Sequence, residues 1–206
     1  MSTRIDPRVV RTRGALQDAL LALALERELD EITVSDIVER AGVNRSSFYQ
    51  HYTDKDTLLS DALGRGLEEV AERAAVCAAV PVFVEGVPLG LTMYLEHIAA
   101  NAPLYRHVLG NHATPAAAAS LRERIVDTVA DSIDPAMPVL FADVPRSVVA
   151  AGITGSVFAV VGEWLRIEPL APVPVVAQWV WRVLTALGTV AALNDAGPEG
   201  FSSSPQ

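Results

Sequence analysis

A short polar run, Asn44-Arg45-Ser46-Ser47, stands where a short helix is expected to begin. Asn at this position caps a helix, because its side-chain oxygen accepts hydrogen bonds from the first backbone N–H groups. Arg45 can donate two hydrogen bonds to one guanine, Ser can bond to purine or pyrimidine edges, and an exposed helix N-terminus favours phosphate. These residue types therefore suit contact with base edges and phosphates in a nucleic-acid groove.

The residues before this run predict a second helix that braces the first. Thr33 is expected to cap it in a capping box with Asp36, and Gly42 stands where a helix end needs a left-handed residue. Two helices joined by a short turn around Gly42 have helix-turn-helix geometry. Phe48 is expected to face inward as the bracing residue. The side chains expected to stay outside are Tyr49, Gln50 and His51.

The pattern of apolar residues predicts an all-α fold. Stripes with a period of about 3.6 residues recur along the chain, and the period-2 alternation of half-buried strands is almost absent. Thr53 with Asp56 predicts a second capping box, and beyond Val80 proline is expected to mark the first position of each helix. The expected helices are 8–27, the segment between Thr33 and Gly42, 45–52, 54–79, 88–101, 103–110, 115–133, 145–166 and 174–194.

The composition excludes several classes of protein. Half of the residues are hydrophobic and 20% are charged, which excludes a disordered chain. The single cysteine, Cys77, excludes an intramolecular disulfide scaffold, and the lack of CxxC or HExxH spacing excludes a thiolate zinc site. The uncharged run 147–162 has 16 residues, fewer than the roughly 20 of a membrane span, so we expect a buried helix and no membrane partner.

The sequence offers little chemistry beyond recognition. The spacings of His97, His107 and His112 match no pair of metal ligands, so neither a metal nor a cofactor is expected. Ser46 and Ser47 lack the glycine frame of a nucleophile elbow, and no phosphate-binding loop is present. The chain is therefore not expected to be an enzyme, although an all-α enzyme with a helix-turn-helix-like corner remains an alternative.

Residues 8–63 resemble the DNA-binding region of TetR-family transcriptional regulators. The matching residues are Thr33, Ile37, Ala41-Gly42-Val43, Ser47, Phe48-Tyr49-Gln50-His51-Tyr52, Lys55 and Leu58-Leu59. The resemblance implies backbone-phosphate contacts from Tyr49, His51 and Lys55. It implies base or groove contacts from Arg45, Ser46, Ser47 and Gln50, and Thr33 completes the set of expected DNA-binding residues.

The charge of this region is unusual for a DNA-binding domain. Residues 1–64 hold 8 basic and 11 acidic groups, net −3, within a chain of net charge −9. Residues 1–13 nevertheless hold four Arg and one Asp, net +3. Affinity for DNA depends on the phosphates that are neutralised locally, so the overall charge does not exclude DNA as a partner.

The resemblance implies three parts: a helix-turn-helix domain over 1–64, a helical ligand-binding and dimerisation domain over 65–196, and a flexible tail over 197–206. Small residues on one face of an expected helix let two helices approach closely, either within the chain or between the subunits of a homodimer. The expected dimer-interface residues are Gly152, Gly155, Ser156, Ala159, Gly162 and Trp179. The candidate pocket residues are Met93, Tyr94, His97, Tyr105, Phe158, Glu163 and Trp164.

These features together predict a cytoplasmic, homodimeric DNA-binding regulator. It is expected to act as a repressor that a small hydrophobic effector releases from a palindromic operator on double-stranded DNA. An effector acts by favouring one of two conformations. The alternative from the same residues is an architectural or constitutive DNA-binding regulator that needs no ligand. The roughly 140 residues after the first domain argue against it, because they exceed what dimerisation alone needs.

Overall fold

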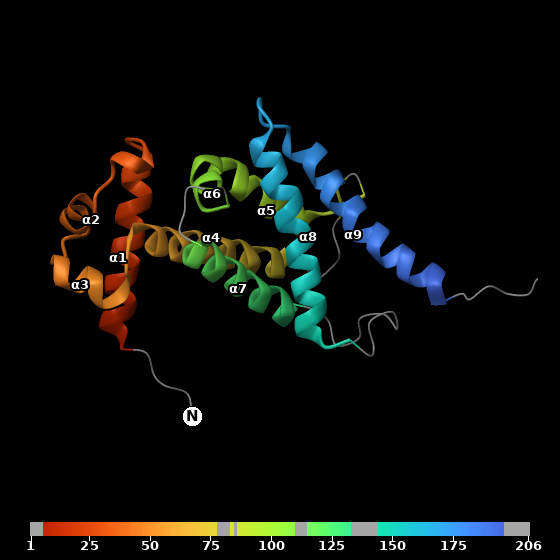
Figure 1. Ribbon diagram of the computed structural model, residues 1–206, viewed down its shortest axis with the longest axis horizontal. Helices are drawn as coiled ribbons and strands as arrows, with labels where there is room; N and C mark the ends of the chain where they lie inside the picture. Colours follow the sequence, from red (N-terminus) through yellow and green to blue (C-terminus); the bar gives the residue numbers. More distant parts are fainter. Residues whose placement is uncertain (1–5, 78–82, 85, 110–114, 133–143, 196–206) are drawn as a thin grey trace, which may run out of the picture.

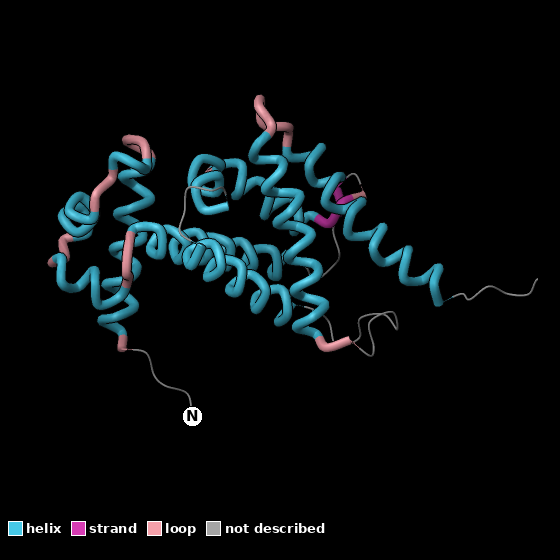
Figure 2. The backbone as a smooth tube through the Cα atoms, viewed as in Figure 1, coloured by secondary structure: helices cyan, strands magenta, loops and turns pink. Residues whose placement is uncertain are grey.

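The computed structural model describes residues 6–77, 83–84, 86–109, 115–132 and 144–195. Within these residues the fold is helical apart from one two-stranded hairpin (Figure 2), so the all-α prediction is confirmed. Helices α1 (Pro7–Ala24), α2 (Val34–Ala41) and α3 (Arg45–His51) gather at one end of the molecule, and α4 (Lys55–Cys77) leads from them into a bundle of the later helices (Figure 1).

Local rules account for the helix ends of the N-terminal unit. Thr33 and Asp36 form the expected capping box, and Gly42 ends α2 in a left-handed conformation with φ of 66°. Asn44 caps α3, because its Oδ1 accepts a hydrogen bond of 2.8 Å from the backbone N–H of Ser47. Helix α1 ends at Ala24 instead of Arg27, because the last N–H groups turn back to the carbonyl of Leu23.

Several expected helix starts are shifted. The cap of α4 is Asp54, whose Oδ1 accepts from the N–H of Thr57 at 2.7 Å, so the predicted pairing of Thr53 with Asp56 is wrong. Pro88 and Pro145 lie at cap positions, one residue before α5 (Leu89–Ala100) and α8 (Arg146–Arg166). In both cases the proline ring precedes the first helical residue, where its missing N–H costs nothing.

The remaining elements complete the bundle. Strand β1 (Phe83–Val84) pairs antiparallel with β2 (Val87–Pro88), a hairpin too short to leave a period-2 signal. A 3-10 turn, η1 (Leu29–Glu31), links α1 to α2. The other helices are α6 (Ala102–Leu109), α7 (Pro115–Ser132) and α9 (Val173–Asp195). Helix α7 lies beside α4, and α8 packs on α6, α7 and α9 (Figure 1).

Helix α8 is long and apolar enough to cross a membrane by length and composition, and a third of its most apolar window is buried. Its Val161, Trp164 and Leu165 belong to the hydrophobic core. The expectation of a buried helix therefore holds for one face of α8 only. The predicted loop 134–144 and tail 197–206 lie almost entirely outside the described residues.

One carboxylate joins the N-terminal unit to the bundle. Asp61 of α4 is 9% exposed, and its Oδ2 accepts hydrogen bonds from Arg13 at 2.7 Å and Gln17 at 2.6 Å, both on α1. The hydroxyl of Tyr52, at the end of α3, also donates to Oδ2. Arg124 of α7 donates to Oδ1. Four segments of the chain thus meet at one buried group.

These partners hold Asp61 ionised. Burial raises the pKa of its carboxyl, but the hydrogen bonds from Tyr52 and Arg13 and the charges of Arg13 and Arg124 outweigh burial, so the pKa lies below its ordinary value of 3.8. A carboxylate with a lowered folded-state pKa adds stability above its unfolded-state pKa and loses that stability as the pH falls through the folded-state pKa.

We expect Asp61→Asn to lower the free energy of unfolding by about 1–3 kcal/mol, because it removes charge-assisted hydrogen bonds from a buried site. Urea unfolding should show this difference unchanged between pH 7 and pH 5, since the pKa of Asp61 lies below 3.8. The matched control is Asp18→Asn, which removes an exposed ion pair with Arg65. Exposed pairs contribute about 0–1 kcal/mol, so an equal effect of the two changes would contradict the role of Asp61.

Candidate nucleic-acid interface and internal cavity

Helix α3 turns one face to the core and the other to solvent. Phe48 is fully buried, and Arg45, Ser46, Tyr49 and Gln50 are exposed, as the sequence predicts. Helices α2 and α3 lie at the end of the molecule away from α9, and none of the described helices or strands lies outside them (Figure 1). Their exposed face is therefore open to a partner as large as a DNA duplex.

Arg45 and Tyr49 form one polar surface on this face. The Arg45 guanidinium lies 5.8 Å from the centre of the Tyr49 ring and donates to its hydroxyl at 3.4 Å. It also donates to Oγ of Ser35, in the first turn of α2, at 3.3 Å. Sequence reasoning missed Ser35, because only the crossing of α2 over α3 brings it to Arg45.

The two serines of the run serve the helix cap. Oγ of Ser46 donates to Oδ1 of Asn44 at 2.7 Å, and Oγ of Ser47 donates to the same atom at 2.8 Å. Ser46 is exposed and Ser47 is half-buried. With their hydroxyl hydrogens directed at Asn44, both oxygens still have lone pairs, so in this arrangement they can accept hydrogen bonds from a ligand.

Two of the expected contact residues, Lys55 and Thr33, have partners inside the domain. Nζ of Lys55 donates to the backbone carbonyls of Leu29 at 2.5 Å and Ile32 at 3.0 Å, which ties the start of α4 to the η1–α2 connection. The Thr33 hydroxyl belongs to the capping box. His51 is half-buried at the end of α3. The structure thus groups Arg45, Ser46, Tyr49 and Gln50 on the open face and gives Lys55 and Thr33 bonds within the fold.

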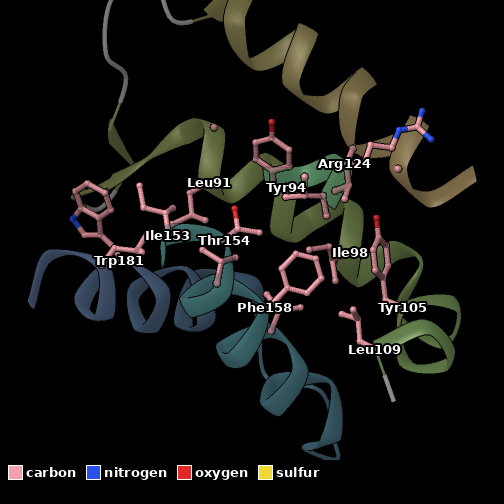
Figure 3. A pocket seen from close by; sticks show the side chains of 17 residues that line it. Leu91, Tyr94, Ile98, Tyr105, Leu109, Arg124, Ile153, Thr154, Phe158 and Trp181 are labelled. Carbon is pink, nitrogen blue, oxygen red and sulfur yellow. The ribbon is translucent and has the colours of Figure 1, made fainter. Parts of the chain in front are cut away.

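A cavity of about 340 Å³ lies within the helical bundle (Figure 3). Side chains of α4 to α9 line it, nearly all of them apolar. Tyr94, Tyr105 and Phe158, three of the expected pocket residues, are among them. Sequence reasoning missed Arg124, Thr154 and Trp181, which reach the cavity from α7, α8 and α9.

Four expected pocket residues lie outside this cavity: Met93, His97, Glu163 and Trp164. The His97 ring packs edge-on against Tyr105, with 6.0 Å between ring centres. Glu163 and Trp164 border a separate, shallower hollow with Trp179. These residues lie on the right helices, but the face of each helix that turns inward depends on packing that one sequence does not reveal.

The small residues of α8 lie on its outer face. Gly152 and Gly155 are exposed, Gly162 is half-buried, and a Cβ atom at any of the three would meet no described atom within 4 Å. Ala159 is exposed too, and the Ser156 hydroxyl donates to the carbonyl of Gly152 at 2.9 Å. Close intrachain packing on this face is therefore absent from the described part of the chain, and Trp179 of α9 is 37% exposed.

The described residues contain no group of three His, Cys, Asp or Glu side chains placed to hold a metal ion. His112 lies outside the described residues. Nε2 of His107 lies 3.1 Å from Oδ1 of Asp56, which links α6 to the first turn of α4.

Residues 16–62 match the family model described as bacterial regulatory proteins, tetR family. The N-terminal part of this chain thus resembles the DNA-binding domain of tetR-family regulatory proteins. The description of this model names regulatory proteins. The matched span includes Thr33, Gly42 and Lys55, which are among the residues that carry the sequence resemblance.

A curated relative is the uncharacterized HTH-type transcriptional regulator YxbF of Bacillus subtilis (strain 168). It is 40% identical over 76 residues, which cover 36% of this chain and 20% of that protein. The match thus spans about a fifth of the length of the relative.

Two solved structures share the fold of nearly the whole chain. Thermus thermophilus FadR, a tetR-family transcriptional repressor in complex with lauroyl-CoA, has a TM-score of 0.68 and 20% identity over 84% of this chain and 93% of its own. A tetR-family regulator from Syntrophomonas wolfei has a TM-score of 0.61 and 17% identity over 86% and 95%. The tetR-like fold thus extends beyond residues 16–62.

Proposed function

We propose that this protein is a tetR-family DNA-binding transcriptional regulator that binds a palindromic operator as a homodimer and is released by a small hydrophobic effector. The observation that carries the proposal is the position of α4. This helix begins directly after the recognition helix α3, and its Gly64 and Leu67 line the cavity. One helix thus connects the surface suited to DNA with the space suited to a ligand.

The exposed face of α3 supports contact with a major groove. Its seven residues include no carboxylate, and Arg45, Tyr49 and Gln50 offer donors and acceptors to bases and phosphates. Arg40 holds Glu26 through two hydrogen bonds of 2.8 Å, and Arg27 lies 3.2 Å from Asp36. Two acidic groups of residues 1–64 are thus paired with arginines within the fold.

We assign Arg45, Ser46, Tyr49 and Gln50 to the DNA-contacting surface, with Ser35 added to it. His51 stays assigned to a phosphate contact at the edge of this surface. Lys55 and Thr33 are assigned supporting roles, because their polar atoms already bond to the backbone or to the helix cap. A lysine that bonds to two carbonyls fixes the turn that carries α2 and so acts on DNA only indirectly.

A twofold dimer is the arrangement that suits this surface. A single recognition helix contacts few bases, and symmetric half-sites about 34 Å apart require a twofold partner. The small-residue face of α8, whose Ala159 borders a shallow hollow with the exposed Trp179, is an apolar surface that a second copy of the chain would cover. This role belongs to the C-terminal part of the chain, over 65–196.

The effector part of the proposal rests on the cavity. A volume of about 340 Å³ with nearly all-apolar walls is in the range of small-molecule sites. The FadR structure, which shares this fold, holds lauroyl-CoA, an acyl ligand. A regulator that needed no ligand would have no use for such a space. We also assign the protein to the cytoplasm, where its DNA lies. We assign residues 1–64 to the DNA-binding domain and residues 65–196 to the ligand-binding and dimerisation domain. Helix α4 runs unbroken through the boundary between them.

Selection of bound sequences from a random duplex library, at two salt concentrations, tests the proposal. We expect a palindromic motif. Arg45→Ala should relax selection at one position of each half-site and cost about 1–3 kcal/mol of binding free energy, because a bidentate contact to guanine is lost. Glu39→Ala, on the exposed side of α2, is the control for a general loss of fold. No enrichment at either salt would contradict the proposal.

Gly155→Leu tests the dimer. The added side chain meets open space in one protomer, so the variant should keep its helix content and melting temperature, while light scattering should report a monomer. Glu96→Leu, at an exposed position of α5 away from the proposed interface, is the control and should remain dimeric. A Gly155→Leu variant that stays dimeric would place the interface elsewhere.

A further inference from the structure

The polar groups around the cavity narrow the class of its ligand. Arg124 is the one charged residue among the side chains that line the cavity in the described part of the chain. Its guanidinium points away from the other labelled side chains (Figure 3). It donates to both carboxylate oxygens of Glu68, at 2.6 and 3.0 Å, and to Asp61. Two carboxylates thus neutralise the one cation at this wall, and its aliphatic part faces the ligand space.

Two hydroxyl groups at the cavity, unlike the guanidinium of Arg124, have no hydrogen-bond partner among the described residues. Tyr105 and Thr154 are each 2% exposed, and neither Oη of Tyr105 nor Oγ1 of Thr154 has a hydrogen-bond partner among the described residues. Buried polar groups almost always have a partner, so such exceptions need an explanation. Both side chains line the cavity, Tyr105 from α6 and Thr154 from α8, and Figure 3 shows them well separated.

Two other buried polar atoms without a partner among the described residues lie away from the cavity. Ser60 Oγ and His97 Nε2 are also buried without a partner among the described residues, but neither residue lines the cavity. Burial also raises the pKa of Tyr105 above its ordinary value of 10, so its phenol stays a neutral donor. The described lining residues therefore offer two buried neutral hydroxyls without a partner, in addition to the half-buried Tyr94, and their one cation, Arg124, is already paired with carboxylates.

We propose that the cavity selects a neutral, largely hydrocarbon molecule that carries an oxygen atom, such as a medium-chain alcohol or ketone, and holds this oxygen through Tyr105 or Thr154. A carboxylate or phosphate ester of the same size is rejected, because its charge would be desolvated among apolar walls whose one charged residue, Arg124, is already paired with Glu68 and Asp61. This inference rests on the proposed function and names the class of its effector.

Calorimetric titration of the purified protein without DNA tests the ligand class. The probes are 1-decanol and decanoate, which share a chain length and differ in charge. We expect 1-decanol to bind at least tenfold more tightly than decanoate at pH 7, where decanoate is ionised. Equal or tighter binding of decanoate, or no binding of 1-decanol, overturns the inference.

Variants test the two hydroxyls. The double change Tyr105→Phe with Thr154→Val should weaken 1-decanol about two- to tenfold, the usual effect of one lost hydrogen bond, without lowering the melting temperature of the ligand-free protein. Weaker binding together with an unchanged melting temperature indicates a ligand contact, because removal of a hydroxyl with a structural role would lower the stability. Thr154→Ser should restore the affinity lost in Thr154→Val if Thr154 is the partner. Unchanged affinity in the double variant overturns the inference.

Ser60→Ala is the matched control. Ser60 also has a buried hydroxyl with no hydrogen-bond partner among the described residues, but it does not line the cavity. Its affinity for 1-decanol should equal that of the unmodified protein. The duplex selection tests DNA binding, which is the other part of the proposed function, independently of the ligand. A protein that selects a palindrome but prefers decanoate overturns the ligand class alone, and a protein that holds 1-decanol through these hydroxyls but selects no duplex overturns the regulator alone.

Discussion

The carboxylate of Asp61 is the group on which the arrangement of the whole molecule depends. A buried charge is stable only when hydrogen-bond donors surround it, and here the donors come from α1, the end of α3 and α7. Arg13, Gln17 and Tyr52 fix the helix-turn-helix unit to α4, and Arg124 fixes α4 to the bundle. The orientation of the recognition helix relative to the cavity therefore depends on this carboxylate, together with the bonds of Lys55 to Leu29 and Ile32.

The same carboxylate lies next to the space for a ligand. Arg124 contacts Asp61 with its guanidinium and the cavity with the rest of its side chain, and Gly64 of α4 lies so close that a Cβ atom there would be 2.8 Å from Cδ of Arg124. A molecule that displaces Arg124 by a small distance acts on a bond to Asp61. Packed interiors respond to such shifts by moving whole elements. This is the physical route by which the proposed effector would reorient α3.

Local chemistry made much of the fold predictable. The caps at Thr33 and Asn44 and the left-handed Gly42 follow from residue types a few positions apart, and the positions of the later helices follow from apolar periodicity and proline. The sequence also indicated the open face of α3. It did not reveal the bonds of Lys55 to two carbonyls, nor the convergence of Arg124, Thr154 and Trp181, because these contacts join residues far apart in the chain.

The central claim is that occupancy of the cavity and binding of DNA are coupled. The direct measurement is the affinity of the full chain for its selected duplex, by fluorescence anisotropy, with the cavity empty and then saturated with 1-decanol. The account predicts an affinity lower by about 5- to 150-fold with the cavity filled, and by linkage the same factor in the affinity for 1-decanol when the duplex is bound. Equal affinity for the duplex in both states would contradict it.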